Sequence, residues 1–378
     1  MSIGSALVPM APAANDAERF LRFLQSRDAN QIVLPETRAV IAEAFHERTQ
    51  LLSTGALDRG TRPPDVAAAA AAPHGPFVVD GLTPAQSARL LHVTGLATQI
   101  APARLQLNRS PESLLNLVRG GGRIHNLYDH IGDPRNDWGS TLRSTTQRLA
   151  FEQREGSFGY GTTVFASPQF GGPMLHPARP LGTADAHSGA EQLRLNTGAL
   201  QFGRGSLIMR PSVLPATMFQ PLDTGLLTDA RIQPKDVSVP FERMNEAFAR
   251  AIAMHHTAEH PGNHAAFLGT NFEGQDLLPG LVAAISRPDA EAARDVARYL
   301  QSEAMTRAWG QANVQLAHAT DAAAMHVQRP NARMYGDGPI PERELAVDRD
   351  LAEFSAATKF PVRFAEPGEY PDHLAWNA

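Results

Sequence analysis

The chain has no cysteine among its 378 residues. This absence excludes disulfides, thiolate metal sites and cysteine nucleophiles. Any chemistry must therefore come from Arg, His, Glu, Asp, Ser, Thr or Tyr side chains.

Lysine is nearly absent as well. Of the 34 Lys and Arg residues, only Lys235 and Lys359 are lysine, which leaves 32 arginines. One interpretation is a GC-rich codon bias, which also accounts for the excess of alanine. The other is delivery into eukaryotic cells, where a protein gains by lacking the amine to which ubiquitin is attached.

The sequence also lacks a long apolar run. No stretch approaches 18 uninterrupted apolar residues, and the longest run of small residues, Ala67 to Ala72, lies between prolines. Residues Met1 to Ala14 have no positively charged start and no apolar segment, so we expect neither a Sec-type signal peptide nor a membrane span. The net charge of -5 gives no reason to expect a nucleic-acid partner.

Composition divides the chain into two regions. Residues 1–15 are rich in Ser, Ala and Pro, whereas 16–27 and 35–52 carry apolar residues at helical spacing. Residues 60–75, with three prolines and six consecutive alanines, are typical of a linker. We therefore predict a disordered and helical N-terminal secretion and linker region at 1–75, and one catalytic domain at 76–378 that draws on the 43% of apolar residues for its core.

Helices and strands are predicted to alternate without a regular βαβ period, which favours an α+β fold. The predicted helices are Thr83 to Leu91, a helix opened by Ser110 and Pro111 and ended by Gly120 to Gly122, Pro240 to His260, and Asp289 to Trp309. The predicted β segments are Arg123 to His130, Gly156 to Phe170, Asn196 to Arg210 and Phe360 to Phe364, with a loop from Pro168 to Gly189.

One motif indicates a metal. His256, Glu259 and His260 form an H-x-x-E-H string at the end of the helix predicted from Pro240. Two histidines at i and i+4 share a helical face and can bind one zinc, while the glutamate acts as general base on a zinc-bound water. Against this, Pro261 follows at once, and histidines in a last helical turn also interact favourably with the helix dipole.

A second set of residues is spread along the chain. It comprises Arg123, the Gly-, aromatic- and Thr-rich segment 158–163, and Glu273 in the segment 272–275. Arginine can hold a phosphate bidentately, an aromatic ring can stack on a nicotinamide, and a carboxylate can stabilise a positively charged ribose. The set fits a site for a pyrophosphate-containing cofactor, although each residue taken singly is also common in structural roles.

A family resemblance connects these pieces. The segment Gly203 to Phe219 resembles the strand-plus-turn signature of a bacterial domain family that includes type III effectors which ADP-ribosylate ubiquitin on threonine. Shorter segments are similar to other strands of that family, and together they span most of 75–364: Gly122 to Asn126 to the first strand, Asn196 to Leu200 to a middle strand, Phe272 to Leu278 to a late Glu-containing strand, and Phe360 to Phe364 to the closing strand.

The resemblance implies a split β-sandwich with flanking helices, as in ADP-ribosyltransferases, and an NAD cleft between its halves. It implies that Arg123 holds the NAD phosphates, with Arg119 as the alternative because its Leu-Val-Arg-Gly context is also similar to an arginine strand. Phe158, Tyr160 or Thr162 would line the nicotinamide pocket, and Glu273 would be the catalytic carboxylate.

These patterns predict a secreted bacterial effector, injected into the host cytoplasm, that transfers ADP-ribose from NAD to a host protein acceptor such as ubiquitin. Two alternatives stay open. One is a zinc hydrolase that uses His256, Glu259 and His260, and the other is a non-catalytic binding protein that keeps the fold without the site.

Overall fold

A computed structural model describes the central and C-terminal parts of the chain. The described residues are 70–71, 75–121, 160–165, 173–176, 181–182, 192–195, 203–219, 221, 239–256, 277–301, 310–314 and 319–365. The predicted boundary at residue 75 lies at the edge of this part and stays a prediction. No helix in these ranges is long and apolar enough to cross a membrane.

The centre of the molecule is an eight-stranded sheet with the order β10-β9-β5-β1-β2-β8-β6-β7. Every neighbouring pair is antiparallel except β9 and β10, which are parallel. The strands are β1 (Arg104–Arg109), β2 (Tyr160–Phe165), β5 (Gly205–Met209), β6 (Thr217–Phe219), β7 (Val239–Pro240), β8 (Gly310–Val314), β9 (Ala322–Gln328) and β10 (Val362–Ala365). A separate hairpin pairs β3 (Pro173–His176) with β4 (Gln192–Leu195).

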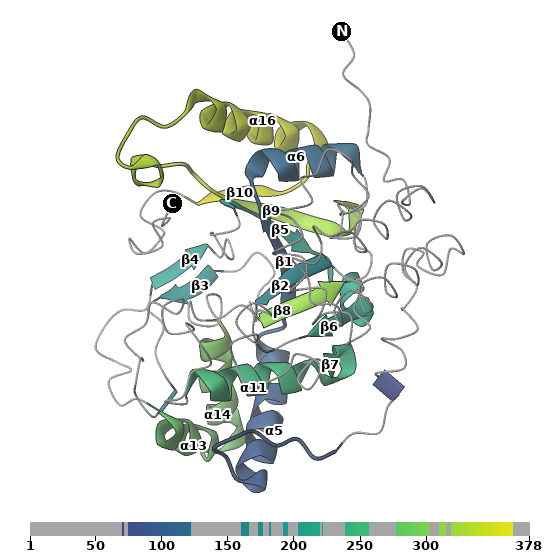
Figure 1. Ribbon diagram of the computed structural model, residues 1–378, viewed down its shortest axis with the longest axis vertical. Helices are drawn as coiled ribbons and strands as arrows, with labels where there is room; N and C mark the ends of the chain where they lie inside the picture. Colours follow the sequence, from purple (N-terminus) through teal and green to yellow (C-terminus); the bar gives the residue numbers. More distant parts are fainter. Residues whose placement is uncertain are drawn as a thin grey trace, which may run out of the picture.

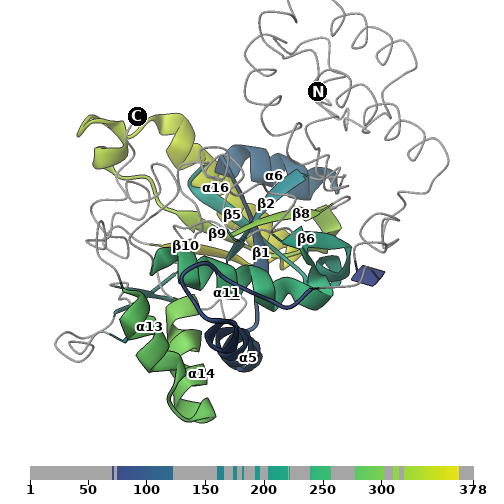
Figure 2. The same ribbon diagram turned by 60° about the horizontal axis from the view of Figure 1, so that its bottom comes forward.

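The helices gather at opposite ends of the sheet (Figures 1 and 2). Near β10, β9 and β5 lie α6 (Pro111–Gly120) and α16 (Glu342–Thr358), which also contact each other. At the other end α5 (Pro84–Ile100) packs on α11 (Met244–His255), α13 (Leu278–Ile285) and α14 (Asp289–Leu300). Mixed helix and strand with this order confirms the α+β class.

Local sequence explains where α5 and α6 begin and end. Thr83 caps α5 through a capping box with Gln86, and Ser110 accepts the Ser113 N–H at the start of α6, where Pro111 takes a position that needs no hydrogen bond. Gly121 then ends α6 in the left-handed conformation, with φ 61°. The predicted cap and glycine stop of α6 are confirmed.

One face of the sheet belongs to the apolar core. Leu107 of β1, Leu207 of β5 and Met325 of β9 are paired across the strands and are buried in one contiguous apolar cluster. Gly205 lies on the same face, where a Cβ would come within 3.0 Å of Leu114 in α6. Side chains on alternate positions of a strand point to opposite faces, so this register fixes one face of β1, β5 and β9 as the core face.

The other predicted elements were partly right. The helix from Thr83 extends further, to Ile100, while those from Pro240 and Asp289 end early, at His255 and Leu300. The loop predicted from Pro168 to Gly189 contains strand β3, because hairpin pairing with β4 satisfies its backbone. The closing strand is confirmed as β10, and strand structure is confirmed within 156–170 and 196–210 as β2 and β5.

Candidate functional site: a buried polar stripe on the central sheet

Strand β1 has two chemically different faces. Leu105 and Leu107 point to the apolar core, so Arg104, Gln106 and Asn108 lie on the opposite face of the sheet. Gln106 and Asn108 are buried, and Arg104 is partly buried. Burial lowers the pKa of the Arg104 guanidinium from its usual value.

The polar face continues across the neighbouring strands. Asn108 is paired with Ser206 of β5, and Ser206 is paired with His326 of β9. Directly paired residues share a face and have Cβ atoms roughly 5 Å apart. We call the set Gln106, Asn108, Ser206, His326 and Gln328 the polar stripe; each of its members is 4% exposed or less.

The polar stripe is separate from the hydrophobic core. Ile208 and Ala324, which are paired with each other on this face, are buried but are not part of the contiguous apolar cluster formed by the described residues. Ala365 of β10, paired with Gln328, is also buried outside that cluster. Polar residues buried in the middle of a sheet are unusual and require hydrogen-bond partners.

Hydrogen bonding within the stripe is uneven. The Asn108 side-chain amide donates to the carbonyls of Gly203 and Gly205, at 3.3 and 3.2 Å, and so ties β1 to the start of β5. Among the described residues, by contrast, no partner reaches Gln106 Oε1, Ser206 Oγ or Gln328 Oε1. A buried polar atom without a partner costs roughly 1–3 kcal/mol, so the stripe holds three groups that an additional hydrogen-bonding molecule would satisfy.

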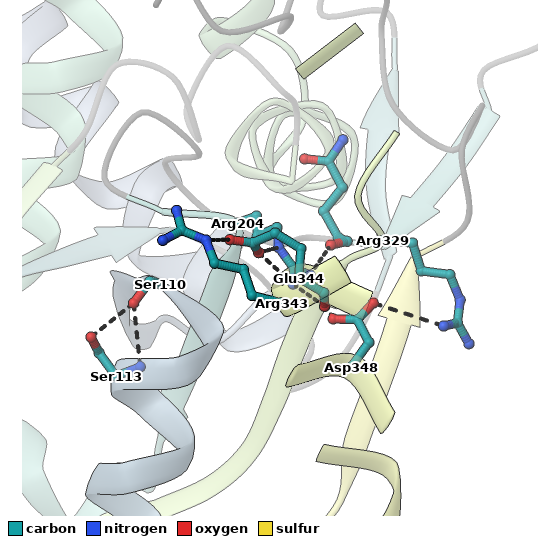
Figure 3. Close-up of polar contacts among 8 residues, drawn as sticks. Ser110, Ser113, Arg204, Arg329, Arg343, Glu344 and Asp348 are labelled. Carbon is teal, nitrogen blue, oxygen red and sulfur yellow. Dashed lines mark hydrogen bonds and ion pairs between the residues drawn. The ribbon is translucent and has the colours of Figure 1, made fainter. Parts of the chain in front are cut away.

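Beside the stripe lies a second buried polar cluster, which we call the Arg204 clamp (Figure 3). Arg204 Nη1 donates to Asp348 Oδ1 at 2.7 Å, and Nε donates to Glu344 Oε2 at 2.9 Å. The same guanidinium donates to the carbonyls of Gln328 and Glu344. These contacts join the start of β5 to β9 and to α16.

The charges of the Arg204 clamp are balanced internally. Two carboxylates, Glu344 and Asp348, surround the buried guanidinium, and Arg329 lies 3.9 Å from Asp348 Oδ2. Burial raises the pKa of the Asp348 carboxyl, although Arg204 acts in the opposite direction. Because its donors are used on protein acceptors, the clamp is a structural connection and not an anion site.

The sequence-predicted pocket residues Tyr160 and Thr162 lie in β2, directly beside β1. Tyr160 is paired with Val314 and Thr162 with Ala312, both of β8, and the neighbouring Thr163 is paired with Gln106. The backbone of the Gly- and Thr-rich segment therefore runs next to β1, but strand alternation places Thr163, and not positions 160 and 162, on the face of Gln106.

Arg119 lies in the helix predicted from Ser110, and not in a strand of the kind that its local sequence resembles. It occupies the last turn of α6, because the Ser110 cap and the helix-forming residues after it hold 111–120 helical until Gly121. Its guanidinium lies 5.9 Å from the centre of the Phe354 ring on α16. Arg119 therefore links α6 to α16 through this contact, and its assignment as the alternative ligand of the NAD phosphates stays a prediction.

The remaining predicted site residues, Arg123, Phe158 and Glu273, lie outside the described residues. The late strand expected at Phe272 to Leu278 is corrected at its end, since Leu278 begins α13, with Pro279 in its first turn. The Leu277 N–H donates to the His256 carbonyl at 3.0 Å, so the end of α11 lies next to the start of α13.

Only the first residue of the zinc motif lies within the described residues. Helix α11 ends at His255, with His256 as its C-cap. His256 Nδ1 donates to the Ile252 carbonyl at 2.7 Å, and its Nε2 accepts the Leu181 N–H at 2.9 Å. Both ring nitrogens are thus used within the protein, and Glu259 and His260 lie outside the described residues. No group of three potential ligands gathers within the part of the chain that the structure covers.

The polar stripe was missed in the sequence, although a signal is present. Arg104 to Arg109 reads R-L-Q-L-N-R, and Met325 to Gln328 reads M-H-V-Q, both with the strict alternation of a strand that has one apolar face. What alternation cannot show is that the polar face is buried rather than exposed, because burial depends on the rest of the fold.

Comparison with known proteins adds no relationship: no protein-family model and no curated protein matches this chain.

Proposed function

We propose that the protein is a mono-ADP-ribosyltransferase, secreted by a bacterium and injected into host cells, that transfers ADP-ribose from NAD to a host protein. The acceptor implied by the resemblance is ubiquitin. The observation that carries the proposal is the position, in the fold, of the segment that most specifically resembles the family. Residues 203–219 form β5, a 3₁₀ turn at Pro211–Ala216 and β6, and β5 contributes Ser206 to the polar stripe.

The central sheet supports the proposal through its chemistry. NAD carries a pyrophosphate, two riboses and an amide, so its site needs cations, hydrogen-bonding groups and protection from water. Arg104 supplies a guanidinium on the same face as Gln106, which is paired with Thr163 of β2. Together with Arg123, it is a candidate for the phosphate contact, because arginine binds phosphate bidentately.

The catalytic role is assigned to Glu273. As nicotinamide leaves, its bond to the ribose breaks and positive charge develops on the ribose. A carboxylate beside that ribose stabilises the transition state more than the ground state. The acceptor side chain then forms the new bond to the ribose and loses its proton.

The test is Glu273→Gln, assayed by nicotinamide release and by mass spectrometry of ubiquitin incubated with NAD. Turnover should fall about 10²–10³-fold with little change in NAD binding, as is typical when one electrostatic stabiliser is removed. Glu353→Gln, on the exposed side of α16, is the matched control and should leave turnover unchanged. Wild-type turnover in Glu273→Gln would exclude Glu273 as the catalytic carboxylate.

A broader experiment addresses the alternatives. Incubation with labelled NAD and a eukaryotic lysate reports activity and acceptor together, and metal analysis of the purified protein reports zinc. No label transfer and no nicotinamide release would favour the non-catalytic effector. Stoichiometric zinc that is lost in both His256→Ala and His260→Ala, together with loss of function, would favour the hydrolase in spite of the hydrogen bonds of His256.

A further inference from the structure

Three polar groups of the polar stripe are buried without a partner within the described part of the chain: Gln106 Oε1, Ser206 Oγ and Gln328 Oε1. They come from three neighbouring strands, β1, β5 and β9, and lie on one face. Three such groups on one face are costly to the free protein, since each has left water without gaining a hydrogen bond. Costs of this kind concentrate at functional sites.

The charge around these groups restricts the ligand. Two guanidinium groups flank the stripe. Arg204 lies next to Gln328 and is already neutralised by Glu344 and Asp348, whereas Arg104 lies beyond Gln106 at the far end of the stripe. The three groups themselves are uncharged and include two amide oxygens, which only accept hydrogen bonds. A phosphate or carboxylate would bring only further acceptors, whereas a group with N–H donors would satisfy them.

We propose that the polar stripe is a binding subsite for an uncharged amide or amino-substituted ring, which donates an N–H group to Gln328 and hydrogen-bonds Ser206, its diagonal neighbour on β5. The inference rests on the proposed function, of which it names the part of the substrate that is bound here. In NAD this chemistry has two sources, the carboxamide of nicotinamide and the amino group of adenine. The stripe thus binds one uncharged end of NAD and not its pyrophosphate.

The proposal also predicts that substitutions in the stripe have opposite effects on stability and on ligand binding. Ser206→Ala and Gln328→Met each remove a polar group that has no described partner, so the free protein should keep or raise its melting temperature. Both variants should nevertheless weaken ligand binding about tenfold, which corresponds to the loss of one hydrogen bond to a buried ligand.

The experiment measures melting temperature and binding of two probes, nicotinamide and adenosine, by titration calorimetry on the full-length chain. One of the two probes should bind, and Ser206→Ala and Gln328→Met should weaken that probe by about tenfold. Inorganic pyrophosphate, as a third probe, should bind wild type and variants equally or not at all. Which uncharged probe responds identifies the end of NAD that occupies the stripe.

Thr94→Val provides the matched control. Thr94 Oγ1 is likewise buried without a described partner, but it lies on α5, away from the sheet. This variant should also keep or raise the melting temperature, and it should bind both probes as the wild type does.

Two outcomes would overturn the inference. The first is unchanged probe binding in Ser206→Ala and Gln328→Met, or no binding of either uncharged probe to the wild type. The second is a fall in melting temperature in both variants, which would mean that the stripe is satisfied inside the free protein. Either result could occur with full NAD turnover, and probe binding could persist in a protein without turnover. The experiments can therefore refute the subsite proposal without refuting the transferase proposal, and the reverse.

Discussion

The Arg204 clamp and the polar stripe are two polar clusters that meet at Gln328, yet they differ in one respect. In the clamp, Arg204 donates to two carboxylates and two carbonyls. In the stripe, Gln106 and Ser206 have polar atoms that no described residue reaches. The two clusters are similarly buried, but the polar groups of the clamp are hydrogen-bonded whereas several of those in the stripe are not.

The difference separates a structural role from a binding role. A satisfied buried network makes its members depend on one another, so removing one member leaves the others uncompensated. A buried group without a hydrogen-bond partner does not stabilise the free protein, so its removal should leave stability unchanged or raise it, and weaken only the binding of the ligand that it contacts. The predictions that follow test this contrast, beginning with the largest effect.

Arg204→Met should be the most destabilising change, lowering the free energy of unfolding by about 3–5 kcal/mol, because it leaves Glu344 and Asp348 without their buried cation. Chemical denaturation measures the loss. Adding Glu344→Leu and Asp348→Leu removes the uncompensated charge, so this triple variant should recover much of the stability. A wild-type midpoint in Arg204→Met would show that the clamp is not a structural connection.

His256→Ala should cost about 2–3 kcal/mol. The Ile252 carbonyl and the Leu181 N–H, each bonded to one ring nitrogen, would both lose a buried partner. Zinc content should not change. His92→Ala is the control, since His92 is half exposed and contacts the exposed Asp289, and it should change stability by no more than about 0.5 kcal/mol. Equal losses in the two variants would contradict the structural role of His256.

The pH dependence of the clamp follows from the raised pKa of Asp348. Because burial raises this pKa above its usual value of 3.8, the folded state holds the proton more readily than the unfolded state. The contribution of this group to stability is therefore fully present below the unfolded pKa and is lost as the pH rises through the folded pKa. The difference in unfolding free energy between wild type and Asp348→Asn should grow, in favour of wild type, as the pH falls from neutral toward 4. A constant difference over that range would contradict the shift.

Thr94→Val should have a smaller effect of opposite sign, a gain of about 1 kcal/mol in unfolding free energy. The substitution replaces a buried hydroxyl without a described partner by a methyl group of similar size. Thermal and chemical denaturation should agree. A loss of stability would mean that unmet buried groups in this fold are not costly, which would also weaken the interpretation of the stripe.

Arg119→Ala should produce the smallest change, a loss of about 0.5 kcal/mol from its contact with the Phe354 ring, with NAD turnover unchanged. Arg119→Lys keeps the cation and should retain most of that contact. A large fall in NAD binding in both variants would instead support Arg119 as the residue that holds the NAD phosphates.

Local signals in the sequence were sufficient for some elements. Ser110, Pro111 and Gly121 determined the bounds of α6, because capping and left-handed backbone preferences act within a few residues. The strand β10 was predicted from its composition, and the segment Gly203 to Phe219 indicated β5 and the turn after it. The sequence analysis missed β1, β6, β8, β9 and α16.

What the sequence by itself determined is the α+β class, the absence of thiol chemistry and the type of residue available for a site. Only the tertiary structure decided that Asn108, Ser206 and His326 form one row, since strand register pairs residues that are 98 and 120 positions apart in the sequence. It likewise decided that both ring nitrogens of His256 form hydrogen bonds, one to the Ile252 carbonyl and one to the Leu181 N–H. Burial and hydrogen-bond partners depend on the whole chain, whereas helix caps and strand alternation depend on neighbouring residues. For this reason the sequence predicted the bounds of α6 but not the buried polar stripe.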